Sequence, residues 1–175
     1  MKTPILETNR LILRPLRIED ATTVFNNWSS DIETTRYMQW DTHKNINDTK
    51  EWLNLEEKLI YSDDNYTWGF ALKETGELIG SGGITYNKER KMFEIGYIIM
   101  HRYWSQGITS EAVEKIIYYA NTELGIKNLL GRHAKENLTS GRILRKNGFM
   151  YHNNGKYSKF SGDAEFECRE YILRL

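Results

Sequence analysis

Hydrophobic residues recur along the chain with two kinds of spacing. Apolar positions three to four residues apart, typical of amphipathic helices, run through residues 18–28, 48–60, 107–124 and 138–146. Short apolar or alternating runs predict strands at residues 11–14, 67–73, 78–86, 92–100, 128–133, 149–158 and 165–173. The order of these segments predicts an α+β fold with a mixed, mostly antiparallel seven-stranded sheet and about four helices.

Length and composition narrow the class of protein. A chain of 175 residues predicts a single domain over residues 1–175 with a core of its own. Lys plus Arg equals Asp plus Glu, 24 of each, so no net field favours nucleic acid or membrane as a partner. The balance is compatible with a monomer or a homodimer.

Cysteine usage, hydropathy and the N-terminal residues add four exclusions. The single Cys168 excludes an intrachain disulfide, and no Cys/His cluster has metal-ligand spacing, so no metal is expected. No apolar run is long enough to span a bilayer, and the polar N-terminus does not resemble a signal peptide. We therefore expect a cytoplasmic protein, with Cys168 as a small core residue.

The most informative stretch is residues 92–120, which predicts a buried strand, a polar turn at Ser105-Gln106-Gly107 and a long helix. A turn that leads into a helix N-terminus exposes unpaired N–H groups beside the positive end of the helix dipole. This arrangement predicts a phosphate or pyrophosphate site. The alternative is an ordinary strand-to-helix turn with nothing bound.

Three further motifs lie in order along the chain: RLILRP at residues 10–15, YWSQGITSEA at residues 103–112, and NLTS at residues 137–140 followed by Leu144 and NGF. Together they resemble the Gcn5-related N-acetyltransferases (GNAT), and within them the RimJ/RimL-like branch that acetylates N-termini of ribosomal proteins. The second motif resembles that branch's acetyl-CoA loop, Y-W-G-K-G-x-A-T-E-A. Ser105 stands where a glycine is usual, and Thr109 where glycine or alanine is usual.

The resemblance implies a GNAT fold, acetyl-CoA as cosubstrate, and direct acetyl transfer to a primary amine of a small molecule or a protein N-terminus. It implies that strand 95–100 splays from strand 128–133, so that pantetheine lies in the gap as an added strand would. Gly96 is a candidate for a bulge there. The implied cofactor-binding residues are Ile98, Ile99, Met100, Ser105, Gln106, Gly107, Ile108, Thr109, Ser110, Asn137 and Ser140. The substituted loop leaves open a second hypothesis, a catalytically weak module that binds or senses acyl-CoA.

Acetyl transfer requires deprotonation of the amine, polarisation of the thioester carbonyl and stabilisation of the departing thiolate. Glu94 matches a position where some relatives carry a carboxylate base. The alternatives are a base that acts through water, or an ion pair of Glu94 with a nearby Lys or Arg.

Many relatives donate a proton from a tyrosine on the helix after the fifth strand, and here that position is Leu144. Ser140 is the matching hydroxyl of the RimL-like branch and a candidate to hydrogen-bond the leaving sulfur. Its alternative role is a helix cap, which Asn137 or Thr139 could supply instead. The Asn137 amide also suits the amides of pantetheine.

The acceptor side is predicted from loops. Residues 31–47, 61–66 and 158–165 are expected to wall a groove. His133 is expected to face solvent on its strand, with a role as a base beside the cofactor as the alternative. These loops offer Tyr37, Trp40, Tyr66 and Tyr157 to the groove, with Asp41, Asp63 and Asp64 available to hold an ammonium group.

Overall fold

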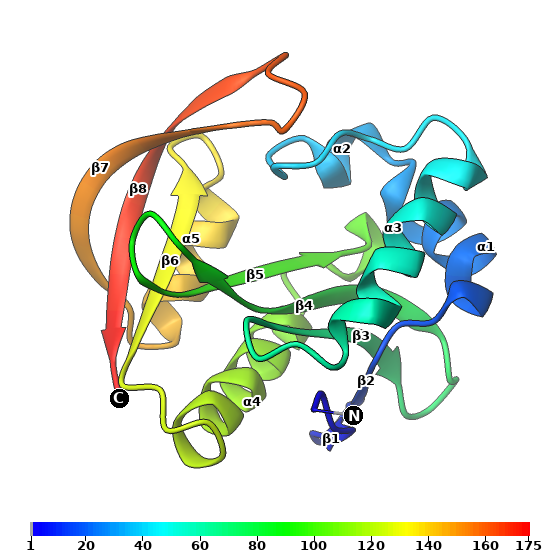
Figure 1. The fold of residues 1–175 in the computed structure, drawn as a ribbon, viewed down its shortest axis with the longest axis horizontal. Helices are drawn as coiled ribbons and strands as arrows, with labels where there is room; N and C mark the ends of the chain where they lie inside the picture. Colours follow the sequence, from blue (N-terminus) through cyan, green and yellow to red (C-terminus); the bar gives the residue numbers. More distant parts are fainter. Residues whose placement is uncertain (1) are drawn as a thin grey trace.

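The sheet has eight strands within residues 2–175, the part of the chain that the computed structural model describes. They are β1 (Leu6–Glu7), β2 (Leu11–Arg14), β3 (Asn65–Leu72), β4 (Leu78–Asn87), β5 (Met92–Ile99), β6 (Asn128–Ala134), β7 (Met150–Ser158) and β8 (Glu165–Arg174). Their order across the sheet is β1-β2-β3-β4-β5-β6-β8-β7 (Figure 1). Every pair is antiparallel except β5 and β6. The predicted mixed, mostly antiparallel α+β fold is confirmed.

The helices are α1 (Ala21–Val24), α2 (Ile32–Thr35), α3 (Ile46–Leu59), α4 (Ile108–Thr122) and α5 (Leu138–Lys146). The predicted helix over residues 18–28 consists of a 3-10 turn, α1 and a wide π-type turn in succession. Two elements were not predicted, the strand β1 and the helix α2. With two and four residues respectively, they are too short to show a hydrophobic period. The sheet therefore gains one strand over the expected seven.

Helices cover both faces of the sheet (Figure 1). On one face α4 buries Ala112, Val113 and Ile116 in a core that also holds Leu144 of α5. On the other face α1 and α3 contribute a smaller cluster, which includes the fully buried Leu53. The apolar stripes that predicted α3 and α4 are therefore the surfaces that pack on the sheet.

The strands β5 and β6 part halfway along their length. Their parallel pairing covers only Phe93–Ile95 against Leu129–Gly131. Beyond this point β5 pairs with β4 alone, and β6 pairs with β8 alone. This confirms the splayed central pair. The predicted bulge at Gly96 is wrong, because the β4–β5 register runs unbroken through Gly96. Gly96 is instead the first residue after the shared ladder ends.

Candidate active site

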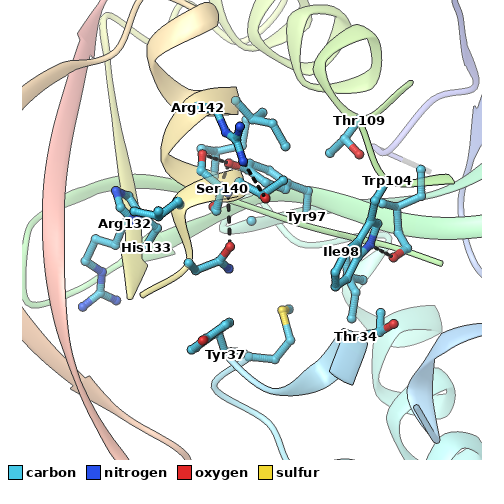
Figure 2. Close-up of a pocket in the computed structure, with 18 of the residues that line it drawn as sticks. Thr34, Tyr37, Tyr97, Ile98, Trp104, Thr109, Arg132, His133, Ser140 and Arg142 are labelled. Carbon is cyan, nitrogen blue, oxygen red and sulfur yellow. Dashed lines mark hydrogen bonds between the residues drawn. The ribbon is translucent and has the colours of Figure 1, made fainter. Parts of the chain in front are cut away.

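A cavity of about 720 Å³ opens where β5 and β6 part. It is bounded by these two strands, the start of α4, α5, the α2 region and the tip of the β7–β8 hairpin (Figure 2). This volume is typical of a small-molecule site. Predicted site residues that line it are Glu94, Ile98, Ile99, Ser105, Gly107, Thr109, Ser110, Asn137 and Ser140. Met100, Gln106 and Ile108 are not among its lining residues in the described chain.

The start of α4 is held in an unusual backbone conformation. Gly107 precedes the helix with φ 76° and ψ 0°, and no side chain of residues 2–175 caps the helix through this position. Ser105 also has positive φ, at 61°. Such a conformation costs a non-glycine residue about 1–2 kcal/mol. The glycine usual at position 105 in the resembling motif thus has a conformational reason, which the motif comparison alone did not reveal.

Glu111 in the first turn of α4 ties the loop to the N-terminal motif. The Arg10 Nε donates to Glu111 Oε2 at 2.7 Å, and Thr8 Oγ1 also donates to this carboxylate. Arg10 Nη1 donates to the Gln106 carbonyl at 3.0 Å. Partial burial acts to raise the pKa of Glu111, but the hydrogen bonds from Thr8 and Arg10 outweigh it and lower that pKa. The first motif therefore braces the second.

The third motif contacts the same helix. Asn147 Nδ2 donates to Ser110 Oγ at 3.0 Å, so the Ser110 side chain already has a protein partner. Thr109 and Ser110 are each 7% exposed, and Ile108 is buried in the main core. The threonine at position 109 is therefore accommodated in a buried first turn rather than projecting into solvent.

The backbone of β5 offers groups to the gap at alternate residues. The Met100 N–H donates to the Ile79 carbonyl at 2.8 Å, which marks Met100 and Ile79 as a hydrogen-bonded pair. In an antiparallel ladder such pairs recur every second residue, so the amides of Ile98 also face β4. Those of Tyr97 and Ile99 face the gap, where Trp104 Nε1 donates to the Ile99 carbonyl at 2.9 Å. Among the three predicted β5 residues the register favours Ile99, and it adds Tyr97.

Glu94 forms the ion pair that was its predicted alternative. Its Oε1 accepts from Arg132 Nε at 2.7 Å, and its Oε2 accepts from Arg132 Nη2 at 2.9 Å and from Asn87 Nδ2 at 2.8 Å. Burial acts to lower the pKa of the Arg132 guanidinium, but its contacts with Glu94 raise it. Both carboxylate oxygens are thus engaged. The role of Glu94 as a base stays a prediction.

Ser140 is not used to cap its own helix. Asn137 Oδ1 accepts from the Ser140 N–H at 3.2 Å, so Asn137 is the N-cap of α5. The Ser140 hydroxyl instead lies 3.0 Å from the hydroxyl of Tyr97 (Figure 2). Burial raises the pKa of Tyr97 well above the usual range of a phenol. Tyr97 was not predicted as a site residue, because an aromatic residue on a central strand reads as core.

His133 is buried, contrary to the expectation that it faces solvent. It is 3% exposed, and an added Cβ on Gly141 would lie 2.6 Å from its ring. Its Nδ1 lies 2.7 Å from the Ala134 carbonyl, which can only accept, so Nδ1 carries the proton. Burial is the main cause that lowers the pKa of His133 and favours the neutral ring. Because α5 packs on the face of β6 that carries His133, with Gly141 against the ring, the alternation of β6 turns His133 inward.

The tip of the β7–β8 hairpin is tied across the cavity to the loop after α2. Lys159 Nζ donates to the carbonyls of Trp40 at 3.0 Å, Met38 at 3.1 Å and Thr35 at 3.5 Å. Burial lowers the pKa of Lys159, which an interaction with Asp41 partly offsets. One ammonium group therefore gathers three carbonyls of the opposite wall.

Two more hydrogen bonds complete this bridge. The Phe160 N–H donates to the Gln39 carbonyl, and the Tyr157 hydroxyl donates to the Tyr37 carbonyl, both at 2.7 Å. All four residues line the cavity. The bridge is visible in Figure 1, where the hairpin tip approaches the loop after α2. The predicted walls at residues 31–47 and 158–165 thus meet over the cavity.

The third predicted wall, residues 61–66, does not take part. Tyr66 is 5% exposed and stacks on Trp68 in the main core. Asp63 pairs with Lys2 on the surface. Asp41, Asp63 and Asp64 are not among the described residues that line the cavity, whereas Tyr37, Trp40 and Tyr157 are. In the sequence, the aromatic residues of residues 61–66 could not be told from those of the other two loops. The position of β3 in the sheet places residues 61–66 away from the cavity.

Two absences hold for residues 2–175. The described residues contain no group of three or more His, Cys, Asp or Glu side chains placed to hold a metal ion. None of their helices is long and apolar enough to cross a membrane.

Comparison with known proteins identifies one family over most of the chain. A family model described as an acetyltransferase (GNAT) domain matches residues 10–150. Over 148 residues the chain is 33% identical to the uncharacterized N-acetyltransferase YoaA of Bacillus subtilis (strain 168), covering 84% of this chain and 83% of YoaA.

Two solved structures share the fold. The ribosomal-protein-S5-alanine acetyltransferase of Vibrio fischeri has a TM-score of 0.77 at 16% identity, over 98% of this chain and 96% of that one. The microcin C7 self-immunity acetyltransferase MccE, in complex with acetyl-CoA and AMP, has a TM-score of 0.82 at 15% identity, over 96% and 94%.

Proposed function

Because the chain belongs to the GNAT family of acetyltransferases, we propose that it transfers the acetyl group of acetyl-CoA directly to a primary amine. The observation that carries this proposal is the cavity at the β5–β6 gap, which runs to the start of α4. The acceptor is a protein N-terminal α-amine, as in the RimJ/RimL-like branch, or the amine of a small molecule. The three motifs support that branch.

The residues present fit acetyl-CoA. The first-turn N–H groups of α4, from Ile108 to Ser110, follow a left-handed Gly107 and suit a pyrophosphate. Arg142 and Lys146 of α5 line the same cavity and add positive charge for phosphates. When bound, acetyl-CoA supplies the thioester that carries the acetyl group. The loop residues Ser105, Gln106 and Thr109 complete the proposed phosphate-binding turn.

The gap supplies groups for the rest of the cosubstrate. The amides of Tyr97 and Ile99 face it and can pair with pantetheine as an added strand would. The side chains of Asn137 and Ser140 line it from α5. Ser140 is the proposed hydrogen-bond partner of the sulfur, and Glu94 is the proposed acceptor of a proton from the amine, directly or through water.

Direct transfer without an acetyl-enzyme is supported by the side chains around the cavity. None of its lining residues in the described chain is a cysteine. Cys168 lies fully buried in β8, where burial raises the pKa of its thiol. A buried thiol with a raised pKa is a poor nucleophile.

The test combines binding and turnover. At a concentration one hundred times its Kd, acetyl-CoA is expected to stabilise the protein by about 2.7 kcal/mol, seen as a rise in Tm. Free thiol release is then measured with N-terminal peptides, polyamines and aminoglycosides as acceptors. We expect acetyl-CoA-dependent release with at least one acceptor class.

Two outcomes would contradict the proposal differently. No rise in Tm with millimolar CoA or acetyl-CoA would remove the cosubstrate itself. A clear rise in Tm with no thiol release on any acceptor would favour the alternative, a module that binds or senses acyl-CoA. The left-handed Ser105 and the paired Glu94 are the observations that keep this alternative open.

A further inference from the structure

The hydroxyls of Tyr97 and Ser140 form a pair on the wall of the cavity. Tyr97 comes from the splayed half of β5 and Ser140 from the first turn of α5 (Figure 2). The Tyr97 Oη lies 3.0 Å from Ser140 Oγ and donates to the Ser140 carbonyl at 3.1 Å. Tyr97 therefore contacts the same residue at both its side chain and its backbone.

Each hydroxyl has only one proton, and this determines which of the two donates to the other. A carbonyl oxygen only accepts, and Tyr97 has one hydroxyl proton, so that proton points to the Ser140 carbonyl. The Ser140 hydroxyl must then donate to Tyr97, and only its lone pairs remain for a ligand. In this state Ser140 cannot donate to sulfur. It can do so only if Tyr97 turns its proton from the carbonyl to Oγ.

We propose that Tyr97 is a positioning residue: by turning its own proton to Ser140 Oγ, it frees the Ser140 proton to be donated to sulfur as negative charge develops there. This inference rests on the proposed acetyl transfer. The bond that forms joins the acceptor nitrogen to the acetyl carbon, and the carbon–sulfur bond breaks with its electron pair going to sulfur. Sulfur takes up the proton that the nitrogen loses. Ser140 and Tyr97 each keep their proton and only redirect it.

Three features of the site favour this role over a simple strut between β5 and α5. Asn137 already caps the Ser140 N–H, so the Ser140 hydroxyl is not needed for the helix. The Tyr97 ring packs against the main core, which holds its hydroxyl in place. Burial raises the pKa of Tyr97 above the ordinary tyrosine value of about 10, so its hydroxyl keeps its proton and stays a hydrogen-bond donor even at alkaline pH.

The experiment compares Tyr97→Phe, Ser140→Ala and the double variant. Losing one supporting hydrogen bond is expected to lower kcat about three- to tenfold in Tyr97→Phe, with little change in KM for acetyl-CoA. Ser140→Ala should lose about tenfold or more. The double variant should be no slower than Ser140→Ala, because Tyr97 acts only through Ser140.

Tyr119→Phe is the matched control. Tyr119 is a buried tyrosine whose hydroxyl donates to the Lys2 carbonyl at 3.1 Å, outside the cavity lining. It loses a similar hydrogen bond, so it should share any cost to stability while kcat stays at the wild-type value.

A second readout does not depend on turnover. The thiol of bound CoA is titrated by the ultraviolet absorbance of its thiolate. A donor aimed at sulfur lowers the pKa of that thiol, so Tyr97→Phe and Ser140→Ala should both raise it above the wild-type value. Tyr119→Phe should leave it unchanged.

Several results would overturn the inference. These are wild-type kcat in Tyr97→Phe, losses that multiply in the double variant, or a bound-thiol pKa that Tyr97→Phe does not change. If the wild type releases no thiol with any amine, the proposed function fails, while the titration of bound CoA still decides the role of Tyr97.

Discussion

Backbone conformation bears on one departure from the resembling motif, Ser105, and side-chain packing bears on the other, Thr109. Ser105 adopts φ 61°, a region that glycine enters at lower cost, and it keeps the tight turn before α4. Gly107 is the second residue of the loop with a left-handed backbone, and here the residue is a glycine, as in the resembling motif. At Thr109 the side chain is buried instead, so the larger residue is absorbed by packing. The loop thus retains its shape with one strained residue.

Two glycine substitutions separate the cost of a strained backbone conformation from the effect of an added Cβ atom on its surroundings. Gly107→Ala would force alanine to φ 76°, although its Cβ would meet only Arg10 Nη2 at 3.7 Å. We expect a loss of about 1–2 kcal/mol in the free energy of unfolding, measured by denaturant titration. Weaker acetyl-CoA binding should accompany it.

Gly96→Ala is the contrasting variant. Gly96 lines the cavity without positive φ, and an added Cβ would meet no atom within 4 Å. We expect an unchanged Tm but a lower kcat/KM, since the methyl group enters the cavity. Equal stability losses in both glycine variants would contradict this distinction.

At the scale of elements, the site depends on segments far apart in sequence that brace one another. The N-terminal motif holds the start of α4 through Arg10 and Glu111, and α5 holds it through Asn147 and Ser110. The β7–β8 hairpin and the loop after α2 close over the cavity through Lys159. In the proposed acetyl transfer, an acceptor amine would enter beside this bridge.

Lys159→Met tests the bridge. Methionine keeps an apolar stem but loses the ammonium that gathers three carbonyls. We expect a loss of about 1–3 kcal/mol in the free energy of unfolding. The KM for the acceptor should change more than the KM for acetyl-CoA, because the bridge lies on the acceptor side.

Lys156→Met is the control on the same hairpin. Lys156 pairs with Glu165 on the exposed surface, a contact of little expected worth. It should leave both stability and the acceptor KM near wild type. If Lys156→Met and Lys159→Met behave alike, the bridge has no special role.

At the scale of the whole molecule, burial in the sheet determines how stability depends on pH. His133 is buried between β8 and α5, and this burial lowers its pKa. The positive charges of Arg169 and Arg145 lower that pKa further. Below about pH 6.5 the unfolded chain gains a proton at this position that the folded chain does not bind. Folding stability from His133 is therefore complete at higher pH and is lost as the pH falls.

His133→Gln isolates this contribution, because other groups titrate in both proteins. The difference in Tm between wild type and variant should shrink between pH 8 and pH 5.5, the window being set by the unperturbed histidine pKa of about 6.5. Each unit by which the pKa of His133 is lowered corresponds to about 1.4 kcal/mol. A difference that stays constant across this range would show that His133 titrates equally in both states.

Particular residues show how far the sequence predicts the site. The helix at residues 138–146 was predicted with the bounds found, because its apolar period and its stop at Asn147-Gly148 are local signals. Tyr97 and Lys159 were missed, since a strand aromatic reads as core and a loop lysine reads as solvated. Tyr66 was wrongly placed at the acceptor groove, because it was assigned to a loop although it belongs to the core.

The amino-acid sequence by itself determined most of the elements, their order and the turn before α4, because hydrophobic period and turn chemistry act over a few residues. Only the tertiary structure decided which side chains meet. The pairing of Glu94 with Arg132, of Tyr97 with Ser140, and of Lys159 with the loop after α2 depends on strand order and the splay of β5 from β6. These contacts join residues that are distant along the chain, so no local pattern encodes them.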